Sequence, residues 1–177
     1  MTVDVWVFGY GSLIFRVDFP FCERRVARLK GFARRFWQRS PDHRGTPDSP
    51  GRVVTLIADP NASVLGVAYR VAPESAERVL ADLDLRERAG YERTDVEIEL
   101  TDPPHGAACA VVYQARPGNP GFSEDSSNEE IASIVRFACG PSGDNASYVR
   151  SLAEALRKLG DDDPHVFEIE RLLNESS

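Results

Sequence analysis

The sequence predicts an α+β domain: a mixed, curled β-sheet or partial barrel with peripheral helices and a helical C-terminal third. Five or six strand-like segments lie before residue 116 with one helical segment among them, and three helical segments follow residue 126. Because strands and helices do not alternate regularly, a doubly wound parallel sheet is disfavoured. The 177 residues are expected to form one domain, residues 1–177, which is long enough to bury a core without disulfides or metals.

Composition argues against several other classes of protein. A net charge of −7 disfavours nucleic-acid binding, which needs a cationic face. The three cysteines are widely spaced and odd in number, which is no disulfide framework, and Cys109 and Cys139 lie in apolar stretches that predict small buried side chains. No basic signal-like segment begins the sequence, and the most apolar stretch, residues 5–15, is too short to cross a bilayer. We therefore expect a cytosolic protein with no membrane partner.

The predicted strands before residue 72 come from short β-branched and aromatic runs. The first covers residues 3–8 and ends at Gly9. Residues 52–58 and 64–71 form two more apolar runs, and the turn-forming Asp59-Pro60-Asn61 between them predicts a hairpin of two separate strands.

Two further strands are predicted between residues 94 and 115. In residues 94–100 apolar side chains alternate with acidic ones, which is typical of a half-buried strand. Residues 107–115 are apolar at nearly every position, so this strand is expected at the centre of the sheet.

The helices are predicted from apolar spacing and from signals at their ends. Pro73 is favoured at a first helical position, and apolar residues from 76 to 83 form one stripe behind it. Ser127-Asn128-Glu129-Glu130 is a capping box that begins a second helix. A third apolar helical pattern, residues 148–159, ends at Gly160, and Asp163-Pro164 begins a last short helix.

The segment Gly9-Tyr10-Gly11-Ser12-Leu13 follows the first predicted strand and is a candidate binding loop. Its glycines let the backbone turn sharply and approach a ligand, and successive N–H groups in such a turn bind carboxylate or phosphate. A tight turn at the end of a strand explains the residues equally well. The segment lacks the lysine of a Walker loop and the third glycine of a dinucleotide-binding loop.

Glu87 lies at the end of the first long predicted helix, within Leu83-Asp84-Leu85-Arg86-Glu87. The helix dipole disfavours an anion there, so a partly buried carboxylate would hold its proton more readily, as a general acid or base requires. The residues alone favour the alternative, a solvated glutamate paired with Arg86 or Arg88.

Other polar groups give weaker indications. Residues 140–145 join two predicted helices and offer a cap at Asp144 or Asn145. The three histidines are about 60 residues apart with no cysteine at ligand spacing, so no metal site is expected. The basic and aromatic residues 34–39 predict a strand with a solvated face, with nucleic-acid stacking or binding of a substrate carboxylate as alternatives.

Several of these segments occur in the order that characterises a known family. They are Val7-Phe8-Gly9-Tyr10-Gly11-Ser12-Leu13-Ile14, Val17-Asp18-Phe19-Pro20, Arg34-Arg35-Phe36-Trp37-Gln38, Asp42-His43-Arg44-Gly45, Pro50-Gly51-Arg52-Val53-Val54-Thr55-Leu56, Gly66-Val67-Ala68-Tyr69-Arg70, Leu83-Asp84-Leu85-Arg86-Glu87 with Gly90-Tyr91, and Gly140-Pro141-Ser142-Gly143-x-Asn145 with Tyr148. The ordered set, spanning about residues 5 to 173, resembles the ChaC family of γ-glutamylcyclotransferases, most of all its compact constitutive branch.

The resemblance implies a cytosolic enzyme that cleaves glutathione to 5-oxoproline and cysteinylglycine without a metal or an organic cofactor. The family's Tyr-Gly-Ser-Leu loop falls on Tyr10, Gly11, Ser12 and Leu13, where it would hold the γ-glutamyl group. The family's catalytic glutamate falls on Glu87. In the implied reaction the substrate α-amine attacks its own γ-carbonyl, and Glu87 acts as base and then as acid.

Three further residues are candidate substrate contacts. Tyr113 on the predicted central strand and Tyr91 after the Glu87 turn either face the pocket or belong to the core. Arg44, in the loop of residues 40–51, is a candidate contact to the glycine carboxylate of glutathione. We expect a monomer with glutathione as its small-molecule partner. The alternatives are a cyclotransferase acting on other γ-glutamyl amino acids or amines, and a non-catalytic module that binds small acidic metabolites.

Overall fold

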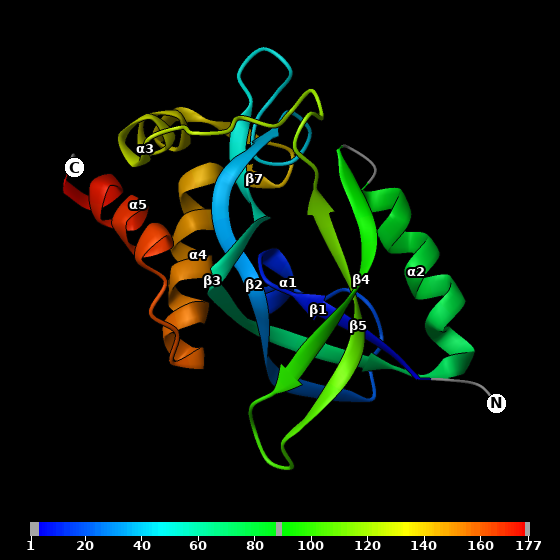
Figure 1. The fold of residues 1–177 in the computed structure, drawn as a ribbon. Coiled ribbons are helices and arrows are strands. Elements are labelled where there is room, and N and C mark those ends of the chain that lie inside the picture. The colour runs from blue at the N-terminus through cyan, green and yellow to red at the C-terminus, as the bar shows by residue number, and fades with distance from the viewer. Residues whose placement is uncertain (1–3, 88–89, 176–177) are drawn as a thin grey trace. The chain divides into compact units, whose positions relative to one another are not determined.

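The computed structural model describes residues 4–87 and 90–175, and it divides into two compact units (Figure 1). Residues up to 33 and residues 58–116 form the first unit, and residues 34–57 with those from 117 onward form the second. Strands β2 (Glu23–Ser40) and β3 (Gly51–Val71) contribute residues to both units. That residues 1–177 act as one domain stays a prediction.

The first unit is built on a closed five-stranded barrel in the order β1-β3-β2-β4-β5. Strand β1 (Val5–Gly9) pairs antiparallel with β3 and parallel with β5 (Gly106–Ala115). Strand β4 (Tyr91–Leu100) pairs antiparallel with β5 along its whole length. The predicted mixed, curled sheet is therefore confirmed. The first strand was predicted from residue 3, which lies outside the described residues, and the structure places its start at Val5.

Alternating burial along β4 and β5 confirms one strand prediction and corrects another. In β4 Ile98 is buried and its neighbours Glu97 and Glu99 are exposed. Strand β5 pairs with β4 and β1, but in a closed barrel every strand has two neighbours and none is central, and Cys109 is exposed because it stands opposite Glu97 on the outward face. Cys139 is exposed as well, in the two-residue strand β6 (Cys139–Gly140). The prediction that both cysteines are buried was wrong.

The hairpin predicted around Asp59-Pro60-Asn61 was also wrong, because the chain runs through these residues in one strand, β3. The turn-forming chemistry is real, since Asp59 Oδ1 accepts a hydrogen bond from the N–H of Asn61 at 3.0 Å. Pro60 and Asn61 are exposed. Strand β2, which has 18 residues, is hydrogen-bonded to the 21-residue β3, so the ladder with this partner keeps the backbone of β3 extended through residues that favour a turn.

Helix α2 (Pro73–Glu87) begins at Pro73, as predicted, and covers the first unit's core. Its buried residues Ala76, Val79 and Leu83 join a cluster that includes Val7 of β1 and Val111 of β5. Figure 1 shows α2 running alongside β4. A four-residue helix, α1 (Ser12–Phe15), follows β1 directly and was not predicted.

The second unit carries the helical C-terminal third: α3 (Asn128–Phe137), α4 (Asn145–Leu159) and α5 (Pro164–Glu175), which contact one another. The predicted capping box at Ser127 is present, and α4 ends at Gly160 with a left-handed φ of 77°. The two-residue strands β6 and β7 (Gly143–Asp144) pair between α3 and α4 in sequence. The buried apolar residues of these helices include Ile131, Val135, Val149, Leu152, Leu156, Val166, Ile169 and Leu173.

Residues 34–39 form part of strand β2 and, as predicted, one face of this segment is solvated while the other is buried. Arg34, Phe36 and Gln38 are buried, whereas Arg39 is exposed. Arg34 Nη1 lies 2.6 Å from Asp163 Oδ2, in the turn before α5. This ion pair permits a charged side chain to sit in the core. Among the described residues no helix is both long and apolar enough to cross a bilayer.

Candidate active site

The loop between β1 and α1 depends on a glycine at its start. A Cβ atom at Gly9 would lie 2.6 Å from the Cβ of Leu13, closer than real side chains approach. The chain therefore folds back on itself here, and α1 begins at Ser12 with Gly11 as its N-cap. Backbone N–H groups in the first turn of a helix have no acceptor within the helix, so those of Ser12 and Leu13 are placed to bind an oxyanion.

Two tyrosine hydroxyls fix this loop to the barrel. Tyr10, which is only 6% exposed, donates from its hydroxyl to the carbonyl of Tyr113 at 2.6 Å. Tyr69 donates to the carbonyl of Leu13 at 2.5 Å, and burial raises the pKa of Tyr69, so it stays a donor near neutral pH. These two hydrogen bonds hold the candidate binding loop in place, as precise positioning of a ligand would require.

Glu87 is the last residue of α2, as the sequence analysis placed it, and its side chain is 22% exposed. Arg86 Nε lies 3.6 Å from Glu87 Oε1. Partial burial had been expected for a general acid or base, and pairing with Arg86 for a solvated surface glutamate. The structure shows both features at Glu87. Arg88, the other partner considered, lies outside the described residues.

Arg86 brings the loop and Glu87 together, a role that the sequence analysis did not assign to it. Its Nη2 lies 3.4 Å from Ser12 Oγ, and its Nη1 lies 3.2 Å from both carboxylate oxygens of Asp18. The guanidinium thus touches the loop, Glu87 and the segment after α1. The sequence offered one indication of this role, which is that Arg86 directly precedes Glu87 in the segment Leu83-Asp84-Leu85-Arg86-Glu87.

Tyr113 and Tyr91 lie in or against the core cluster of the first unit. Tyr113 donates from its hydroxyl to Asp84 Oδ1 at 2.7 Å, and Arg93 Nη1 donates to Asp84 Oδ2 at 2.9 Å. Burial and the negative charge of Asp84 raise the pKa of Tyr113, so this phenol remains protonated. Asp84, one helical turn before Glu87, is a second residue that sequence reasoning missed.

Arg44 belongs to the second unit, and its surroundings there are well defined. Its Nη1 donates to the carbonyl of Asp144 at 3.1 Å, and its guanidinium lies 5.4 Å from the ring centroid of Tyr148. Asp144 caps α4 by accepting from the N–H of Ser147, so the cap predicted in this segment is confirmed. A contact from Arg44 to substrate stays a prediction.

Buried Asn145 anchors the loop that carries Arg44. Its Oδ1 accepts from the N–H of Arg52 at 2.7 Å, and its Nδ2 donates to the carbonyl of Arg52 at 2.9 Å. A Cβ at Gly51 would lie 2.5 Å from both Asn145 Oδ1 and the carbonyl oxygen of Arg44. Only glycine permits this close packing, which explains the fixed path of the segment.

Comparison with known proteins places these residues in a family. The family model described as ChaC-like protein matches residues 5–176. Glutathione-specific gamma-glutamylcyclotransferase 1 of Danio rerio is 40% identical over 174 residues, covering 96% of this chain and 89% of the relative. The glutathione-specific gamma-glutamylcyclotransferase of Saccharomyces cerevisiae is 34% identical over 207 residues, covering 90% of this chain and 89% of the relative.

Solved structures agree with the sequence relatives. A crystal structure of the yeast gamma-glutamyl cyclotransferase specific to glutathione superposes with a TM-score of 0.91 and 30% identity, covering 97% of this chain and 96% of the yeast chain. A structure named gamma-glutamyl cyclotransferase, at 14% identity and a TM-score of 0.57, shares the fold. The family model and the relatives together establish that the chain belongs to the ChaC-like protein family.

Proposed function

We propose that this protein is a glutathione-specific γ-glutamylcyclotransferase that converts glutathione to 5-oxoproline and cysteinylglycine. The relatives support this proposal, because they are named as glutathione-specific gamma-glutamylcyclotransferases. The observation that carries it is the Arg86 guanidinium, which touches both Ser12 of the binding loop and Glu87. A loop suited to hold the γ-glutamyl group and a carboxylate suited to move protons are thereby held together in the first unit.

The proposed reaction is an intramolecular displacement. The α-nitrogen of the γ-glutamyl group attacks the γ-carbonyl carbon and closes a five-membered lactam, while the bond from that carbon to the cysteine nitrogen breaks. The attacking nitrogen loses two protons overall and the departing nitrogen gains two. One carboxylate that accepts and returns protons in turn balances the reaction, and we assign this role to Glu87.

The remaining residues hold the substrate and its charges. Arg86, whose Nε lies 3.6 Å from Glu87 Oε1, holds this carboxylate in place for the proton transfers. The amides of Gly11, Ser12 and Leu13 would bind the oxyanion or the α-carboxylate. Fixing the folded substrate conformer supplies much of the acceleration, because nucleophile and electrophile are already in one molecule. We assign Tyr10, Tyr91 and Tyr113 to the walls of the γ-glutamyl site.

We further propose that the protein works as a cytosolic monomer, with no metal, organic cofactor, nucleic acid or membrane as partner. The acidic net charge and the few widely spaced cysteines support these assignments. Because glutathione is itself an anion, local cationic and N–H groups must attract it. Arg44 is our candidate for the glycine carboxylate.

The experiment that tests the function compares two γ-glutamyl compounds. The purified protein is incubated with glutathione or with γ-glutamyl-alanine, and 5-oxoproline, glutamate and the released amine are quantified by mass spectrometry. We expect equimolar 5-oxoproline and cysteinylglycine from glutathione, and much less product from γ-glutamyl-alanine. Equal turnover of both compounds would point to a general γ-glutamyl specificity. Intact glutathione after hours, or free glutamate as the product, would contradict cyclisation.

A further inference from the structure

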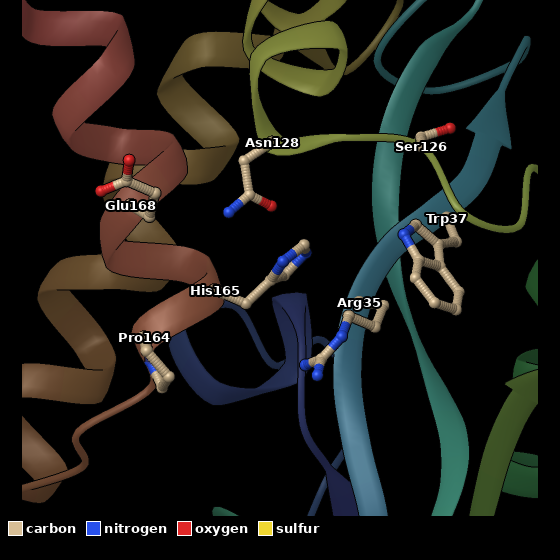
Figure 2. Close-up of a pocket in the computed structure, with 7 residues that line it drawn as sticks. All are labelled: Arg35, Trp37, Ser126, Asn128, Pro164, His165 and Glu168. Carbon is tan, nitrogen blue, oxygen red and sulfur yellow. The ribbon is translucent and has the colours of Figure 1, made fainter.

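The second unit contains an open pocket of about 550 Å³ in which hydrogen-bond donors predominate (Figure 2). Arg35 and Trp37 of β2 form one side, His165 and Glu168 of α5 another, and Ser126 and Asn128 the region around the start of α3. None of these residues was assigned to the γ-glutamyl site, whose loop and glutamate lie in the first unit.

Arg35 gives this pocket an uncompensated positive charge. Its Nη1 donates to the carbonyl of Arg34 at 2.8 Å, and within residues 4–87 and 90–175 it forms no ion pair. The nearby carboxylates already have cationic partners: Asp163 is bonded to Arg34, and Glu168 accepts from Arg171 Nε at 2.8 Å and Nη2 at 2.6 Å. Glu168 is the carboxylate that lines the pocket, and because it is paired with Arg171, the Arg35 guanidinium is left to bind an anion from solution.

Trp37 presents a donor that the protein itself does not satisfy. Its indole Nε1 is buried and has no hydrogen-bond partner among the described residues. Buried donors nearly always have a partner, so this N–H is available to a water or a ligand in the pocket. Figure 2 shows this nitrogen on the side of the indole that faces His165 and Asn128. The ring is fixed by an edge contact with Phe122, at 6.4 Å between centroids.

His165 adds a donor whose tautomer the structure defines. Its Nε2 accepts from the N–H of Phe36 at 2.9 Å, so a neutral ring must carry its proton on Nδ1. Burial and the charge of Arg35 lower the pKa of His165 to about 4, which keeps the ring neutral at pH 7. His165 is 8% exposed and therefore holds a fixed orientation.

We propose that this pocket binds the oxyanion group, carboxylate or phosphate, of a small metabolite. The planar fork of Arg35 binds two oxygens of such a group, and the indole N–H and the imidazole N–H donate to it as well. The volume exceeds that of an inorganic ion, so the rest of the metabolite lies against the Trp37 ring. The site gives the basic and aromatic residues 34–39 a ligand separate from the γ-glutamyl substrate.

Trp37 also supplies the probe for a direct test. The chain has two tryptophans, so Trp6→Phe leaves Trp37 as the single fluorescent indole. This variant is titrated with sodium phosphate and, separately, with sodium acetate at pH 7, with sodium chloride holding the ionic strength constant. We expect a saturable change in Trp37 emission with at least one of the two anions. The anion that saturates identifies the group.

Added variants separate this site from general charge effects. Arg35→Gln should weaken the apparent affinity by about tenfold or more, as expected for a charge-assisted hydrogen bond. Arg28→Gln removes a half-buried arginine of the same strand that bonds Ser63 in the first unit, and should leave the affinity unchanged. Arg35→Lys keeps the charge and should bind the anion more tightly than Arg35→Gln. Circular dichroism checks that both variants are folded.

The proposal is overturned if neither anion gives a saturable change, or if Arg35→Gln binds as well as the parent. An equal loss in Arg28→Gln would also overturn it, because surface charge alone would then explain the binding. Glu87→Gln on the same background should bind the anion normally. Binding can therefore succeed or fail independently of the proposed cyclotransferase activity.

Discussion

The Nε atom of Arg86 lies 3.6 Å from Oε1 of Glu87. The same guanidinium reaches Ser12 Oγ with Nη2 and Asp18 with Nη1. A side chain that was first considered only as a surface partner of Glu87 therefore connects the end of α2 to the loop after β1. We infer that it orients Glu87 toward the γ-glutamyl site.

Replacing Arg86 with glutamine should lower kcat about 10- to 100-fold with a smaller effect on KM, because one charge-assisted contact positions the base. Arg78→Gln, an 88% exposed arginine side chain on the same helix, is the matched control and should behave as wild type. An unchanged kcat in Arg86→Gln, or a loss that falls on KM alone, would show that Arg86 does not position Glu87.

Asp163 should matter for stability rather than for catalysis. It pairs with the buried Arg34 at 2.6 Å, and its Oδ1 accepts from the N–H of Val166 at the start of α5. Asp163→Ala removes both contacts and should lower the free energy of unfolding by about 3–5 kcal/mol, measured by urea denaturation. Asp163→Asn can keep the helix cap and should cost less. A loss below about 1 kcal/mol for Asp163→Ala would mean that Arg34 is not held by this carboxylate.

Acidification should destabilise the protein partly through His165. Its pKa is about 4 in the folded protein, because of burial and the nearby Arg35, against about 6.5 in the unfolded chain. Between these values the unfolded state binds the extra proton, so the contribution to stability is complete above pH 6.5 and is lost as the pH falls toward 4. His165→Gln should therefore show a shallower fall in Tm from pH 7 to 4.5. Parallel Tm curves would contradict this assignment.

Activity should survive treatment with EDTA followed by desalting. The proposed steps need a carboxylate and backbone donors, and the resemblance to the ChaC family implies no metal. Turnover of glutathione is measured before and after treatment, with added Mg²⁺ or Zn²⁺ as separate arms. Loss of activity on chelation that is restored by one of these ions would overturn the cofactor-free assignment.

The elements that the sequence predicted correctly have their signals within a few residues. Pro73, the Ser127 capping box and Gly160 each act on the helix end where they stand. The wrongly predicted hairpin and the unforeseen burial of Arg34 both concern long-range pairing. The path of β3 through Asp59-Pro60-Asn61 depends on a partner strand, and the burial of Arg34 depends on Asp163, which lies 129 residues away. No local pattern encodes either relationship.

The candidate site divides in the same way. Glu87 and residues 10–13 could be predicted as site residues from the sequence, because their segments match those of the ChaC family and occur in the same order. Arg86 joins them across 74 residues, a distance that only the folded chain reveals. Tyr10 illustrates the same limit: its hydroxyl bonds the backbone of Tyr113, and the residue type alone predicts a polar contact without naming the partner.

The most direct test of the account is the rate of 5-oxoproline release from glutathione by Glu87→Gln, beside Glu77→Gln as a matched control on the same helix. Glutathione binding to each variant is measured by calorimetry, so that lost binding and lost chemistry can be told apart. We predict that Glu87→Gln binds glutathione but releases no detectable 5-oxoproline, while Glu77→Gln, an exposed residue, matches wild type. Normal turnover by Glu87→Gln would contradict the assignment of Glu87 as the group that moves the protons.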